Sequence, residues 1–238
     1  MRSLGVEGVL RGWGTTLAWS SALEAFDGHS FLVGSEQDVI HWRAAGMCDA
    51  SGRVGSAWNR ALSAATASER ELSIVARDGR IVFLTRVVAG RRDVVCVLTR
   101  GAVRGADLRV TEPWVEVAVA PHTEAWTILR RVLPRDAALR RAPRTKVRHD
   151  PVVPRAVLTR PRPEHTSEYA RWMADVFAQT PAFVEVCASP RRVVVVGEGR
   201  EVSWIPGPRT LYRCEGDVVA SVSDGDLATT LLSTLRLR

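Results

Sequence analysis

The sequence predicts an α+β protein in which antiparallel β-sheet strands and helices are segregated along the chain. Two observations lead to this fold class: β-branched runs are separated by short turns, and stretches with helical apolar spacing stand before and after them. The same order recurs on both sides of an arginine- and proline-rich segment. We therefore expect two similar helix–meander–helix halves related by a pseudo-two-fold: residues 1–133, a basic linker at 134–163, and residues 164–238, together forming one structural unit.

Helices open and close the first half. Ser35 can cap a helix, Asp38 stands at the third position of a capping-box-like pair, and Gly46 is a natural stop. A second helix is indicated by apolar residues at helical spacing that include Trp58 and Leu62. After the strands, a closing helix is expected over 121–133, where the opening proline suits the first helical turn.

The strands of the first half form a predicted meander. Runs at 71–76 and 80–88 flank Asp78-Gly79, and such a pair between β-branched runs is typical of a hairpin turn. A second turn at 90–93 leads into a strand at 94–99, and a further strand is expected at 115–119.

The second half repeats this order. A helix that Thr166 can cap ends at Pro181, and a closing helix begins at Ser223. Between them we expect five strands, at 182–188, 192–196, 201–205, 210–213 and 218–222. The two meanders are expected to join edge to edge, because this would remove two exposed sheet edges.

Positive charge is concentrated in one segment of this chain of 238 residues with net charge +7. Residues 130–162 hold eleven basic residues against two acidic ones, a balance of +9, together with five of the twelve prolines. Proline breaks helices, so we expect an extended segment with a short strand at 152–158. It is either a solvated linker or an arm that contacts phosphate, and the second reading makes nucleic-acid binding the alternative function.

Composition and motifs exclude several classes. No apolar run is long enough to span a membrane, and Glu7 and Arg11 argue against a secretory signal, so a cytoplasmic location is expected. The sequence has no phosphate-binding GxxxxGK[ST] and no GxSxG, and its histidines are scattered, so we expect no enzyme activity, no metal and no cofactor. An enzyme without a recognisable signature stays an alternative. Four widely spaced cysteines are read as buried free thiols: Cys48, Cys96, Cys187 and Cys214.

The stretch 43–101, RAAGMCDASGRVGSAWNRALSAATASERELSIVARDGRIVFLTRVVAGRRDVVCVLTRG, carries a family resemblance. It resembles the EspG family, the ESX (type VII) secretion-associated proteins of actinobacteria. The shared features are a helix ending in glycine, here Gly46, a D-x-x-G-R-V connector from Asp49 to Val54, and a meander with an Asp-Gly turn. The stretch VSWIPGPRTLYR at 202–213 looks more loosely like the family's tryptophan strand, turn and following strand, without its compact Gly-Arg-Tyr.

The resemblance implies a cytosolic chaperone or adaptor that has no cofactor and binds a PPE-like secretion substrate before export. The family's contact surface involves the sheet face, a strand–strand loop and the C-terminal helices. On this chain the loop corresponds to 90–93, which makes Arg91 and Arg92 contact candidates or, equally, two solvated turn arginines. Trp204 and Trp114 each lie in or beside an expected strand, where the side chain could pack in the core or contact a partner. We take Trp204 as a third contact candidate.

Overall fold

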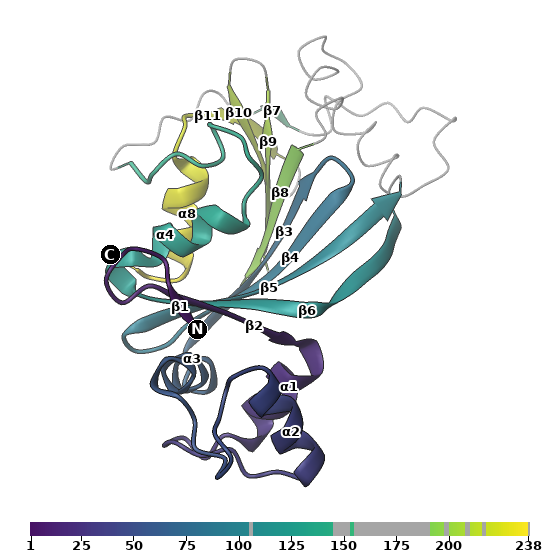
Figure 1. Ribbon diagram of the computed structural model, residues 1–238. Coiled ribbons are helices and arrows are strands. Elements are labelled where there is room, and N and C mark those ends of the chain that lie inside the picture. Colours follow the sequence, from purple (N-terminus) through teal and green to yellow (C-terminus); the bar gives the residue numbers. More distant parts are fainter. Residues whose placement is uncertain are drawn as a thin grey trace.

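In the part of the chain that the structure describes, eleven strands form one sheet, drawn in Figure 1. The computed structural model describes residues 1–104, 107–144, 153–154, 191–197, 200–207, 210–215 and 218–237. The strands are β1 (Arg2–Ser3), β2 (Leu10–Thr15), β3 (Arg70–Asp78), β4 (Ile81–Ala89), β5 (Asp93–Arg104), β6 (Asp107–Pro121), β7 (Val153–Pro154), β8 (Arg191–Gly197), β9 (Arg200–Pro206), β10 (Leu211–Glu215) and β11 (Val218–Val222). The α+β class with a large antiparallel sheet is confirmed.

The two meanders meet in the middle of this sheet. The strand order is β1-β2-β6-β5-β4-β3-β8-β9-β10-β11-β7, and every neighbouring pair is antiparallel. The first described strands of the two meanders, β3 in one and β8 in the other, pair with each other from Ser73↔Val196 to Asp78↔Arg191. The prediction that the meanders join edge to edge is therefore confirmed, and each meander satisfies the backbone groups of the other's edge.

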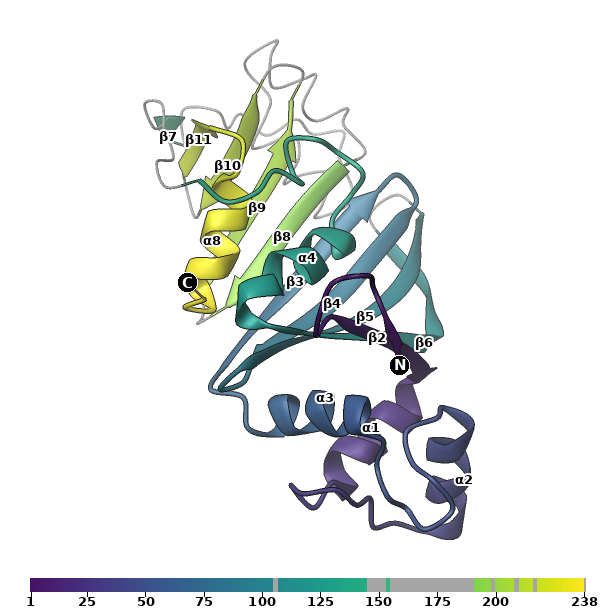
Figure 2. The ribbon, with the colours of Figure 1, turned by 60° about the vertical axis from the view of Figure 1, so that its left-hand side comes forward.

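Helices lie on both faces of the sheet. The helical elements of the described residues are α1 (Thr16–Ala25), α2 (Glu36–Ala44), α3 (Ser56–Thr66), η1 (His122–Glu124), α4 (Ala125–Leu129), η2 (Arg130–Val132) and α8 (Asp226–Thr234). Figures 1 and 2 show α1, α2 and α3 on one side of the sheet, with α4 and α8 on the other. Within the described part of the chain, no helix is both long and apolar enough to cross a membrane.

Two separate apolar clusters follow from this layering. Alternate strand residues such as Ile74, Cys96 and Trp204 point toward α4 and α8 and form one core. Val95 and Val117 point the other way and pack with Trp42, Trp58 and other residues of the α1–α3 layer. The valine-rich strands are apolar on both faces because both faces of the sheet are packed.

Local signals placed several elements correctly. Ser35 Oγ accepts the Asp38 N–H at 3.2 Å, and the Asp38 carboxylate accepts the Ser35 N–H at 3.1 Å, so the capping box is confirmed. The hydrogen bonds from Ser35 lower the pKa of Asp38. Gly79 has a φ of +65° in the β3–β4 turn, the left-handed conformation that glycine tolerates best.

Other elements differ from the predicted ones. β6 begins at Asp107, well before the predicted 115–119, because β5 supplies ladder partners within residues 107–111. Residues 112–114 lie at a register shift between the two strands and are exposed. The predicted helix at 121–133 is divided into η1, α4 and η2. β2 and α1 were not predicted; Thr15 caps α1 by accepting the Ala18 N–H at 3.0 Å. The predicted helix capped by Thr166 and the strand at 182–188 lie outside the described residues, as does most of the predicted strand at 152–158, of which β7 is the described part.

Candidate functional site

A half-open groove of about 400 Å³ lies between α1 and the sheet. Its walls come from the first residues of α1 and from the middle of strands β3 to β6. The residues that line it are Thr16, Trp19, Ser20, Leu23, Ser73, Ile74, Val75, Leu84, Thr85, Arg86, Val97, Thr99 and Val115. We call this surface the α1 groove.

Strand alternation builds the floor of the α1 groove. Val97 and Val115 belong to the face that packs on α1–α3, and the ladder register puts Val75 beside Leu84 on that same face. Val75, Leu84 and Val97 are half-buried, so their side chains are accessible in the groove. On the neighbouring strand Val196 pairs with Ser73 and is 41% exposed, so accessible apolar surface continues from the groove onto β8.

Charge within the α1 groove is neutralised. Arg86 donates two hydrogen bonds of 2.6 Å, one to each carboxylate oxygen of Glu71. This bidentate pair raises the pKa of Arg86, chiefly through the hydrogen bonds. The other polar groups at the groove are hydroxyls, from Thr16, Ser20 and Ser73 among others. A surface of this kind suits a neutral, largely apolar segment better than a charged small molecule.

Groups that perform acid–base or metal chemistry are dispersed. Among the described residues, no cluster of three or more His, Cys, Asp or Glu side chains is placed to hold a metal ion. Burial raises the pKa of the Cys96 thiol, and burial with the nearby Asp49 charge raises that of Cys48, so neither thiol is activated as a nucleophile. Cys48, Cys96 and Cys214 are free thiols; Cys96 and Cys214 are buried as expected, Cys48 is only half-buried, and Cys187 lies outside the described residues.

The candidate arginines Arg91 and Arg92 lie in the β4–β5 turn and are both exposed. The turn beneath them is well anchored. Gly90 N–H donates to Asp93 O at 2.9 Å, and His122 N–H donates to Arg92 O at 3.1 Å. Asp93 also forms an ion pair with Arg60 of α3. The two guanidinium groups are therefore presented from a fixed backbone, and neither arginine is among the residues that line the α1 groove.

The third candidate, Trp204, is not at the surface. It is fully buried, and its indole N–H donates to Asp226 Oδ2 at 2.7 Å. The Arg213 guanidinium lies 5.7 Å from the indole ring centroid and 3.6 Å from Asp226. The expectation that Trp204 contacts a partner is corrected, because its side chain extends from β9 toward α8 and is part of the core. Trp114, in contrast, is 56% exposed.

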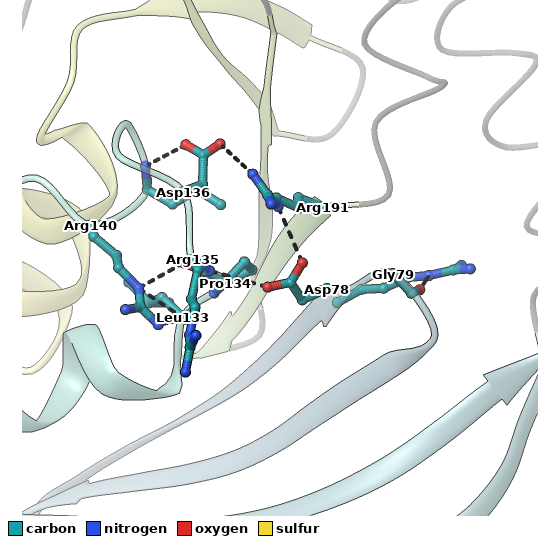
Figure 3. Close-up of polar contacts among 10 residues, drawn as sticks. Asp78, Gly79, Leu133, Pro134, Arg135, Asp136, Arg140 and Arg191 are labelled. Carbon is teal, nitrogen blue, oxygen red and sulfur yellow. Dashed lines mark hydrogen bonds and ion pairs between the residues drawn. The ribbon is translucent and has the colours of Figure 1, made fainter.

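The described beginning of the basic segment packs against the fold. Arg140 donates to Leu133 O at 2.5 Å and to Pro134 O at 2.8 Å, and Leu139 is fully buried. Figure 3 shows this segment meeting the β3–β4 turn, where the Arg135 N–H donates to Asp78 at 3.2 Å. The expectation of an extended, solvated linker is therefore wrong for residues 134–140, because buried apolar side chains and backbone carbonyls hold them in place, whereas residues 141–144 are exposed and form no helix or strand.

Comparison with known proteins adds no relative. No protein-family model matches this chain, and no curated protein sequence matches it.

Sequence reasoning missed the residues that make the α1 groove. Trp19 and Leu23 belong to a helix that was not expected, because its apolar residues lack a clear one-sided stripe. The strand residues carried a usable signal, since alternate positions are apolar on both faces and one of those faces must be covered or bind something. The sequence does not show which part of that second face the helices leave open.

Proposed function

We propose that this protein is a non-enzymatic chaperone or adaptor that binds a secretion substrate protein before export, in the manner implied by its resemblance to the EspG family. The observation that carries the proposal is the α1 groove, an apolar and charge-neutral hollow of about 400 Å³ on the part of the sheet face that the α1–α3 layer leaves uncovered. Such a surface holds a neutral apolar segment of a partner protein and shields it from water. The client is a PPE-like ESX substrate.

The arrangement of the sheet supports the EspG-like reading of the fold. From the central β3–β8 pair, the strands of each meander follow outward in chain order on both sides. A short helix follows each meander, α4 after β6 and α8 after β11, and the two pack against one another on the same face. A pseudo-two-fold relation between the halves accounts for this pattern.

The anchored β4–β5 turn gives the client a second point of contact. Arg91 and Arg92 are exposed on a backbone that its hydrogen bonds hold in place, so a partner carboxylate would bind without ordering the turn first. In this proposal the groove supplies most of the affinity through apolar contact, while the two arginines affect orientation and association rate.

Co-purification from the native host tests the proposal. Tagged wild-type protein is expected to bring down a secretion substrate that mass spectrometry identifies as PPE-like. Leu84→Glu places a charge on the floor of the α1 groove and is expected to abolish that capture. Because Leu84 is only half-buried, the variant is expected to fold, which circular dichroism verifies.

Ile81→Glu is the matched control. Ile81 lies on the same strand, is 50% exposed and, being an odd number of residues away, faces the other side of the sheet. The control is expected to capture the substrate as wild type does. If wild-type protein repeatedly brings down no secretion substrate, or if both variants lose it equally, the proposed function is wrong.

A further inference from the structure

Four arginines gather on the α4 and α8 side of the sheet, within eleven residues of sequence. Arg130 and Arg131 form part of η2, and Arg135 and Arg140 follow in the segment that packs against the β3–β4 turn. The first three side chains are exposed and Arg140 is half-buried. We call these four residues the arginine cluster.

The carboxylates nearest the arginine cluster bind other groups. In Figure 3, Asp78 accepts the backbone N–H of Arg135 and the Arg191 side chain, at 3.2 Å each. Asp136 pairs with Arg191 at 3.5 Å and accepts the Ala138 N–H at 2.9 Å. Neither carboxylate is paired with a guanidinium of the cluster.

This lack of pairing contrasts with the rest of the described chain. Carboxylate ion pairs are made by Arg11, Arg60, Arg86, Arg100, Arg141, Arg191 and Arg213. Across the described residues, no ion pair is found for any member of the arginine cluster. Burial lowers the pKa of Arg140, as do the charges of Arg135, Arg130 and Arg131, while the charge of Asp78 opposes this shift. The cluster therefore holds four like charges close together that Asp78 offsets only in part, and a bound anion would relieve the remaining repulsion.

The surroundings of the cluster favour one class of anion. The exposed large apolar side chains among the described residues all lie outside 122–144, and Val132, Leu133 and Leu139 are buried. The cluster therefore has no apolar side chain to add hydrophobic insertion to the electrostatic attraction of anionic lipid headgroups, which disfavours a membrane as its ligand. A nucleic-acid backbone carries the densest regular array of phosphates, and guanidinium groups bind phosphate oxygens in pairs while counterions are released.

We propose that Arg130, Arg131, Arg135 and Arg140 form a binding site for the phosphate backbone of a nucleic acid. Contacts to phosphate carry no sequence information, so the site is expected to bind duplexes of any sequence. No exposed aromatic ring lies among the four arginines to stack on unpaired bases. It is independent of the proposed client site, which lies on the opposite face of the sheet and is built from different residues.

Fluorescence anisotropy with a short labelled duplex DNA tests the site. We compare wild type with R130Q/R131Q, which removes two exposed charges and leaves Arg140 and its carbonyl hydrogen bonds intact. Losing two phosphate contacts lowers the slope of log affinity against log salt by about 1.8. Between about 50 and 200 mM salt, wild type is therefore expected to lose roughly 12-fold more affinity than the variant.

R91Q/R92Q is the matched control, since it removes an adjacent pair of exposed arginines from the β4–β5 turn. It is expected to leave the salt slope unchanged. The proposal is overturned if wild type does not bind the duplex at low salt, or if R130Q/R131Q keeps the wild-type slope. It is equally overturned if the control lowers the salt slope as much as the cluster variant does, because binding would then depend on net charge alone. Binding of wild type to anionic lipid vesicles but not to the duplex would overturn it as well.

Discussion

Replacing Trp204 by Phe separates the core role of this residue from the partner-binding role that its sequence context left open. The substitution removes a 2.7 Å hydrogen bond to the buried Asp226 carboxylate. Hydrogen bonds to charged groups contribute about 1.5–3 kcal/mol, and the smaller ring leaves a void that adds about 1 kcal/mol. Because Asp226 is 2% exposed, water cannot readily replace the lost donor. We therefore expect the substitution to lower the free energy of unfolding by about 3 kcal/mol.

Chemical denaturation followed by circular dichroism measures this change. At this chain length, about 3 kcal/mol also lowers Tm by about 6–12 °C. Trp114→Phe is the matched control, because Trp114 is 56% exposed and its replacement is expected to change stability by less than about 0.5 kcal/mol. In a double-mutant cycle, W204F is expected to lower the free energy of unfolding less in an Asp226→Asn background than in wild type.

The reasoning is refuted if W204F unfolds within about 0.5 kcal/mol of wild type, since the hydrogen bond would then not lie in a water-excluded core. It is refuted in the same way if the variant keeps full stability but loses a partner that wild type binds.

Three further predictions concern other positions. Gly90→Ala is expected to lower Tm, because the added Cβ would lie 2.9 Å from the Ala64 carbonyl oxygen; an unchanged melting curve would contradict that packing. The Ser35 hydrogen bonds lower the pKa of Asp38, so their stabilisation is complete above its ordinary value of 3.8 and is lost as pH falls through the lowered pKa. Wild type and Asp38→Asn should therefore differ in Tm at neutral pH and converge in strong acid. Cys96 is 1% exposed with a raised pKa, so iodoacetamide is expected to modify it only after unfolding, as peptide mass mapping would show.

The local elements were predictable where the signal lies in neighbouring residues. The Ser35–Asp38 capping box and the Asp78-Gly79 turn each depend on groups within a few positions, and both formed as expected. The predictions were less accurate where residues far away in the sequence decide whether a segment forms a strand. The early part of β6 alternates only over Leu108 and Val110 before Glu112 and Pro113 interrupt the pattern, and it is a strand because β5 offers its backbone groups alongside.

The basic segment shows the same limit at the level of a candidate site. Its prolines and arginines predict an extended, solvated chain, and its charge predicts contact with phosphate. Whether any given arginine is available depends on groups far away in sequence. Arg141 forms an ion pair with Asp224 at 3.4 Å. Arg191 of β8 forms ion pairs with Asp78 and Asp136, the two carboxylates near the arginine cluster.

By itself, the sequence determined the α+β class and the antiparallel meanders, because strand period and turn chemistry depend on neighbouring residues, while the joining of the two halves was expected only from the general need to pair sheet edges. Only the tertiary structure decided that Trp204 is buried with its indole N–H on Asp226, that α1 leaves a groove beside β3–β5, and that residues 134–140 pack against the fold. The physical reason is that exposure and charge pairing depend on which distant surfaces meet, and residue spacing along the chain does not specify that.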